Sequence, residues 1–184
     1  MHRLRILTLT LLVAGTTMVA TSQPAEAAEM IIQDTGKHSR NMQLDFTGTA
    51  WFFGNTTWFG GAAWFGIPVV EDGFIPPWND SFYVEFGTFA NYFFFNNLGL
   101  ADYSYFALVP SGGVRWNFHL TPDWTVFATG KIGVRLPIAG SSLAETRFVG
   151  LGSIGAYWHM SEAMYIRLET GNYGVLQAGV SIQL

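Results

Sequence analysis

The chain has 184 residues, enough for one domain, with a net charge of -4, 12% charged residues, 16% aromatic residues and 21 glycines. The acidic balance argues against a nucleic-acid partner, and the absence of cysteine excludes disulfides, cysteine-ligated metals and thiol nucleophiles. Few charges with many aromatic residues and glycines are typical of membrane β-barrels, in which aromatic side chains mark the two interfaces.

The N-terminus has the three parts of a secretory signal peptide. His2, Arg3 and Arg5 form a basic start, residues 6–20 are apolar and uncharged, and Ala25-Glu26-Ala27 is a small-x-small cleavage site. A retained anchor helix is the alternative, but the apolar run is short against the ~20 residues that a spanning helix needs. We therefore expect residues 1–27 to be removed on export. Residues 28–40 are polar and lack a pattern, and we expect a flexible lead-in.

The mature chain reads as eight strands separated by turn signals. We expect them near 43–52, 58–68, 81–95, 103–119, 124–136, 146–158, 164–170 and 175–184, with a bulge at Pro110–Gly113. Residues 46–70 are uncharged and could be taken for a membrane helix. Their five glycines and the turn signal Asn55-Thr56-Thr57 instead favour two strands. Residues 58–68 are apolar on both faces, so their register cannot be assigned.

The last ten residues alternate apolar and polar or small side chains and end the chain. Their pattern of Gln177, Gly179, Ile182 and Leu184 resembles the C-terminal assembly signal of bacterial outer-membrane barrels, in which the last residue is usually aromatic. With the segment 113–124 (GVRWNFHLTPDW) and the strand pattern, residues 41–184 resemble the small OmpA/OmpX-type outer-membrane β-barrel families. A bilayer admits only helices or closed barrels, because each backbone polar group must be paired.

The resemblance implies an all-β, eight-stranded antiparallel up-and-down transmembrane barrel in the bacterial outer membrane. Outer-membrane lipid and the assembly machinery would be its partners, and both termini would face the periplasm. The turns near 69–80, 120–123 and 159–163 would then be periplasmic, and the loops near 54–57, 96–103, 139–145 and 171–174 extracellular. Since the longest connection, 69–80, falls on the periplasmic side, either the order slips by one hairpin or the outer loops are short.

Eight charged side chains fall on the faces predicted to point into the lumen, because a charge facing lipid costs ~2–4 kcal/mol near the midplane. We expect a network of ion pairs that plugs the lumen. The alternative is a narrow, weakly anion-preferring pore or a small-ligand pocket that inward aromatic residues such as Phe89 and Phe127 would line. The eight are Asp45, Glu85, Arg115, Lys131, Arg135, Arg147, Arg167 and Glu169.

Three other patterns have a weaker functional interpretation. Gly150–Gly155 matches G-x-G-x-x-G, but no βαβ unit surrounds it, so close strand packing is the better explanation. His159, Ser161 and Glu162 are similar to the His and Ser of outer-membrane lipid A deacylases, but they lie in a turn. The few histidines offer no metal cluster. Outward aromatics near the turns are expected to form an interface girdle: Trp116, Phe118, Trp124 and Trp158.

The expected function is a small structural or surface-interaction protein of the outer membrane, without enzymatic activity, cofactor or metal. A surface ligand could bind loops carrying Trp58, Tyr103 and Tyr173. The alternatives are a narrow pore or hydrophobic-ligand transporter, a lipid-modifying enzyme, and a secreted soluble barrel of the lipocalin type. A lipocalin would place apolar residues inside and charges outside.

Overall fold

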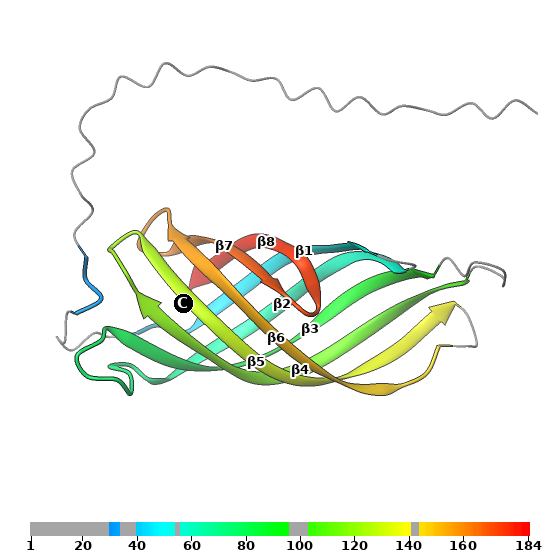
Figure 1. Cartoon of the computed structure of the whole chain (residues 1–184), viewed down its shortest axis with the longest axis horizontal. Coiled ribbons are helices and arrows are strands. Elements are labelled where there is room, and N and C mark those ends of the chain that lie inside the picture. The colour runs from blue at the N-terminus through cyan, green and yellow to red at the C-terminus, as the bar shows by residue number, and fades with distance from the viewer. Residues whose placement is uncertain (1–29, 34–39, 54–55, 96–102, 141–143) are drawn as a thin grey trace, which may run out of the picture.

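The computed structural model describes residues 30–33, 40–53, 56–95, 103–140 and 144–184, so the predicted signal peptide lies outside the described residues. Eight antiparallel strands form a closed barrel in chain order (Figure 1). The strands are β1 (Gln43–Phe53), β2 (Thr56–Val70), β3 (Asp80–Phe95), β4 (Tyr103–His119), β5 (Trp124–Gly140), β6 (Arg147–His159), β7 (Met164–Gly171) and β8 (Gly174–Gln183). The predicted fold class and strand number are confirmed. In the described ranges, no helix is apolar and long enough to cross a membrane.

Several boundaries differ from the prediction. Thr56 and Thr57 belong to β2 and pair with Phe53 and Phe52, so the first hairpin turns more tightly than its turn signal suggested. Strand β5 continues through 137–140, which we expected to be loop. The expected bulge at Pro110–Gly113 is wrong. The register between β4 and β5 shifts between Phe106 and Ala107, whereas Pro110 stays in register with Thr88 of β3.

The strands alternate as predicted, with polar side chains inside and apolar side chains outside. On β1, Asp45, Thr47 and Thr49 are buried, whereas Phe46 and Phe52 are exposed. The structure also supplies the register of β2, where Trp58, Ala62 and Trp64 point inward and Phe59 and Ile67 point outward. Apart from Asp80, at the start of β3, every charged residue of the eight strands falls on the inward register.

We call the barrel end that carries Gln43 and Gln183 the termini end, and the other the far end. The turns 71–79, 120–123 and 160–163 lie at the termini end, and the eight-strand order excludes a slip by one hairpin. The described part of the N-terminal segment joins this end, because Ile31 N donates to Leu120 O and Asn79 N donates to Ile32 O. Asp80 Oδ2 anchors the long turn by accepting from Phe74 N at 3.1 Å and from Trp116 Nε1 at 2.6 Å.

Strand β8 closes the barrel against β1, as predicted, from Gln43 opposite Gln183 to Ala50 opposite Leu176. The hairpin of β7 and β8 is short, with strands of 8 and 10 residues against 17 in β4 and β5. Pairing of β6 with β7 stops at Ser153 opposite Gly171. The wall is therefore lower at this hairpin, and β5 and β6 extend past it toward the far end (Figure 1).

Candidate functional site: a closed lumen with an aromatic far end

The middle of the lumen holds a cluster of ion pairs that joins five strands. Arg115 on β4 contacts Glu85 on β3 (Nη1 to Oε1, 2.5 Å) and Asp45 on β1 (Nη1 to Oδ2, 3.3 Å). Arg167 on β7 contacts Asp45 (Nη1 to Oδ2, 2.5 Å), Glu85 (Nη1 to Oε1, 3.2 Å) and its own-strand neighbour Glu169 (Nη2 to Oε2, 2.7 Å). These side chains are all at least nine-tenths buried.

Lys131 on β5 completes the cluster, because its Nζ lies 2.8 Å from Glu85 Oε2. Six of the eight charged residues predicted for the lumen thus come together, three carboxylates and three cations, and their formal charges cancel. This balance meets the condition under which buried charges are tolerated, since each lies beside an opposite charge in a region that water does not solvate.

Aromatic side chains hold the cations of the cluster. The Tyr157 hydroxyl is hydrogen-bonded to both guanidinium groups and donates to Asp45 Oδ2 at 3.3 Å. The Arg167 guanidinium carbon lies 4.8 Å from the centre of the Phe127 ring, and Lys131 Nζ lies 4.4 Å from the Trp64 ring. Phe127, an inward aromatic residue expected from the sequence, and Tyr157 therefore act as packing partners of this ion-pair cluster.

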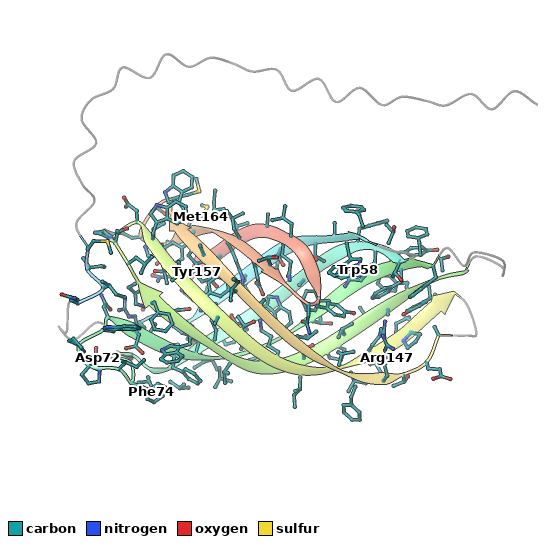
Figure 2. The ribbon with its side chains drawn as sticks, in the orientation of Figure 1. Trp58, Asp72, Phe74, Arg147, Tyr157 and Met164 are labelled. Atoms are coloured by element: carbon teal, nitrogen blue, oxygen red, sulfur yellow. The ribbon has the colours of Figure 1, made fainter. Side chains whose placement is uncertain are left out.

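An aromatic and aliphatic layer lies next to the ion-pair cluster on the far-end side. Trp64 packs edge-on against Phe89 (4.9 Å between ring centres), with Val109 and Leu151 in the same buried group. A second group follows, in which Trp58, Phe93 and Tyr105 pack together. Figure 2 shows Tyr157 in the half of the barrel toward the termini end and Trp58 toward the far end. Two different kinds of packing thus fill successive levels of the lumen.

At the termini end, a hydrogen-bonded chain of hydroxyl and imidazole groups links the inner faces of the four neighbouring strands β3 to β6. Ser81 Oγ lies 2.9 Å from His119 Nε2, His119 Nδ1 lies 2.9 Å from Thr125 Oγ1, and Thr125 Oγ1 lies 3.2 Å from His159 Nε2. Ser161 is not part of it, because its Oγ accepts from Met164 N at 3.1 Å. The residues compared with a lipid A deacylase site are therefore not joined by a hydrogen bond in the described structure.

The remaining two predicted lumen charges, Arg135 and Arg147, are apart from the ion-pair cluster. They are direct partners on β5 and β6 and line a cavity of about 450 Å³ at the far end. We call it the far-end cavity; its lining also includes Trp51, Trp58, Phe93 and Tyr173. Arg135 Nη1 donates to the Tyr105 hydroxyl at 3.0 Å. The sequence predicts the inward face for both arginines, but it does not predict that neither forms an ion pair with a carboxylate of the described residues.

The glycines and the C-terminal pattern have structural roles. A Cβ on Gly155 would overlap the Phe127 ring, so close packing explains this part of G-x-G-x-x-G, but Gly150 and Gly152 face open space on the outer wall. Of the residues of the C-terminal pattern, Gln177 and Gly179 face inward, and Ile182 and Leu184 are exposed outside. A Cβ on Gly179 would overlap the Phe46 carbonyl of β1, so this glycine lets the closing strands approach.

Outward aromatic side chains gather at both ends of the barrel. At the termini end, where the sequence predicts a girdle, Trp124 stacks on Trp158 (6.3 Å between ring centres) and Trp116 packs at a tilt against Phe118 (4.8 Å). Toward the far end, Tyr92 packs against Phe94 (4.6 Å). Within the described ranges, no group of three or more His, Asp or Glu residues could hold a metal ion.

Comparisons with known proteins give little beyond shape. No protein-family model matches the chain, and no curated protein matches it. Among solved structures, the chain is similar to a barrel from work described as "De novo design of transmembrane beta-barrels". That similarity has a TM-score of 0.43 and 15% sequence identity, and it covers 81% of this chain and 100% of the designed one.

Proposed function

We propose that this protein is an integral β-barrel of the bacterial outer membrane with a closed lumen and a structural or surface-interaction role. The observation that carries the proposal is the reversed polarity of the barrel. The ion-pair cluster is buried inside, whereas apolar side chains such as Ile132, Ile154 and Leu176 are more than 60% exposed outside. A soluble barrel of the lipocalin type would have the opposite arrangement, and a hydrocarbon environment explains this one.

The packing of the lumen favours a plug over a pore. Arg115, Arg167 and Val109 have no exposed surface, and Trp64 has 1%. An eight-stranded barrel has an interior just wide enough for side chains to fill it. The pore and the axial transporter are therefore the less favoured proposals, and neither catalysis nor a cofactor is part of this one.

The experiment combines folding and conductance. The mature chain, refolded in detergent and transferred to lipid vesicles, should migrate faster on a gel before heating than after. In planar bilayers it should give no steady conductance, while a general porin run in parallel gives large steps. A monomer that stays soluble without detergent would contradict the membrane proposal. Reproducible single-channel steps from the folded protein would contradict the closed lumen and favour the narrow pore.

Export and the outer-membrane location are tested in cells. Expressed with its own N-terminus in a Gram-negative host, the chain should lose residues 1–27 and fractionate with the outer membrane. Retention of the full mass, or recovery from the inner membrane, would contradict this part of the proposal while leaving the closed barrel in place. Lipid A of unchanged mass in the same cells would agree with the absence of lipid-modifying activity.

A further inference from the structure

The low wall at the β7–β8 hairpin makes a notch beside the far-end cavity. Strand β6 pairs with β7 only from Ser153 onward, and β1 pairs with β8 only as far as Ala50. Asn172 covers part of the free edge of β6. Its side chain donates to Gly150 O at 3.0 Å and accepts from Gly152 N at 2.9 Å, as a neighbouring strand would. Among the described residues, the edge of β6 beyond Gly150 has no strand partner on this side.

A second hollow lies on the outer wall at the same notch. It measures about 470 Å³, and glycines of three strands line it: Gly112 and Gly113 on β4, Gly130 on β5, and Gly150 and Gly152 on β6. A Cβ added to Gly130, Gly150 or Gly152 would meet no atom within 4 Å. Gly150 and Asn172 line both this hollow and the far-end cavity. The two spaces therefore lie next to each other at the notch.

The described lining residues of the far-end cavity carry two positive charges and no negative charge. Arg135 and Arg147 are direct cross-strand partners, an arrangement in which like charges repel. Among the ion pairs of the described residues, none involves either arginine. Arg135 is 5% exposed, and its Nε has no hydrogen-bond partner there. A buried guanidinium with an unused donor, next to a second cation, is suited to an anion.

Aromatic side chains surround these cations. The Arg135 guanidinium carbon lies 5.4 Å from the Phe93 ring centre, and Trp58 stacks on Trp51 and contacts Tyr173. Burial raises the pKa of the Tyr173 phenol, although the Asn91 side chain and Arg147 act in the opposite direction. The cavity thus combines an apolar, aromatic surface with two cations and, among its described lining residues, no carboxylate.

From these observations we infer that the far-end cavity and the notch form a binding site for a single-chain anionic amphiphile of the fatty-acid type. Arg135 and Arg147 would bind the carboxylate, and the acyl chain would leave through the notch past Gly150 and lie in the glycine-lined hollow. The outward side chains beside this path are apolar, with Phe148 87% exposed and Leu176 61%. The chain would therefore stay in contact with membrane hydrocarbon. The inference rests on the proposed membrane barrel and adds a lateral site that the plug does not block.

The test measures binding of cis-parinaric acid, a fluorescent fatty acid, to the mature protein in phosphatidylcholine nanodiscs, with empty nanodiscs as background. Binding should saturate, and palmitate should displace the probe while methyl palmitate should not, because the ester lacks the charge. R135Q/R147Q should raise the Kd about tenfold or more, as expected for lost hydrogen bonds to a charged group. R147Q alone, at an exposed position, should give a smaller rise in the same direction.

A matched pair of outer-wall variants tests the path of the acyl chain. Gly152→Leu should fill the hollow and weaken binding. Gly48→Leu, on the outer wall of β1, should leave the Kd unchanged, because a Cβ there meets only the Ala178 carbonyl oxygen, at an ordinary contact distance of 3.9 Å. Displacement by methyl palmitate as effective as by palmitate, or an unchanged Kd in both arginine variants, would overturn the inference. Equal losses in the two glycine variants would also overturn it. A sample that folds in lipid and does not conduct, yet fails to bind, contradicts only this inference and leaves the proposed function intact.

Discussion

At the scale of single residues, charge balance decides which side chains this lumen tolerates. Glu85 has three cationic partners, Arg115, Arg167 and Lys131, within 3.2 Å. Each belongs to a different strand, so one carboxylate joins β3 to β4, β5 and β7. Ion pairs buried in this way contribute less to net stability than their short distances suggest, because both partners have lost their hydration. Loss of one partner is costly, since the other charge stays buried.

The first prediction follows from this difference between the small net contribution of an intact buried ion pair and the large cost of removing one partner. Glu85→Gln should lower the free energy of unfolding by about 3–5 kcal/mol, because it leaves Lys131 and two arginines with too few carboxylates. The double variant Glu85→Gln/Lys131→Met should recover a substantial part of the loss by restoring neutrality. Urea unfolding in lipid vesicles, followed by tryptophan fluorescence, measures both. Arg147→Gln, a cation outside the ion-pair cluster, is the control, and a loss as large as that of Glu85→Gln would contradict a role for charge balance.

At the scale of elements, the closing strand depends on a close approach between backbones. Gly179 of β8 lies opposite Thr47 of β1, and a Cβ there would overlap the Phe46 carbonyl and the Thr47 backbone. The same addition at Gly130 on β5 meets open space. Alternation puts the two glycines on different faces, with Gly179 on the inward face and Gly130 on the outward face. It does not show that only Gly179 lies so close to the neighbouring backbone that a side chain would disturb the pairing.

The second prediction compares these two glycines directly. Gly179→Ala should lower the free energy of unfolding by about 1–3 kcal/mol or more, as expected for overpacking against backbone that cannot move aside. Gly130→Ala should change it by less than about 0.5 kcal/mol, the range of an unconstrained surface substitution. The fraction of the fast-migrating, unheated gel band and the urea midpoint report the effect. Equal behaviour of the two variants would show that the β1–β8 seam is looser than the structure indicates.

The individual strands also show which features of the fold the sequence predicts and which it does not. Alternation places the strand faces wherever polar and apolar residues alternate strictly, as on β1, β3 and β5. It fails on β2, which is apolar on both faces, and there the partner strands set the register. The sequence pattern also does not predict where the register shifts between β4 and β5. Pro110 suggests an irregularity at its own position, but the extended strand accommodates this proline without a shift. Alternation predicts the correct face for Arg135 and Arg147, but their separation from the carboxylates depends on the stagger between strands, which the sequence of a single strand does not determine.

At the scale of the whole molecule, the medium around the barrel decides whether its exposed apolar surface is stabilising or costly. Ile132, the central residue of β5, is 76% exposed, and its cross-strand partners Gly112 and Gly150 have no side chain to cover it. In water this surface would be costly and prone to aggregate. In hydrocarbon it is the favourable surface, and a charge at the same position is the costly one.

The last prediction tests whether the outer wall of the barrel faces hydrocarbon, where a charge is costly, or water, where it is not. In lipid vesicles, Ile132→Arg should lower the free energy of unfolding by about 2–4 kcal/mol, the cost of a cation near the bilayer midplane. Met160→Arg, an equally drastic change in the exposed turn between β6 and β7, should cost about 0–1 kcal/mol, because this turn would lie at or beyond the interface. If Ile132→Arg were instead neutral and made the protein soluble without detergent, the barrel would belong in water. A loss confined to Ile132→Arg would place the middle of β5 in hydrocarbon and the turn beyond it, since only a bilayer distinguishes two exposed apolar residues by their depth.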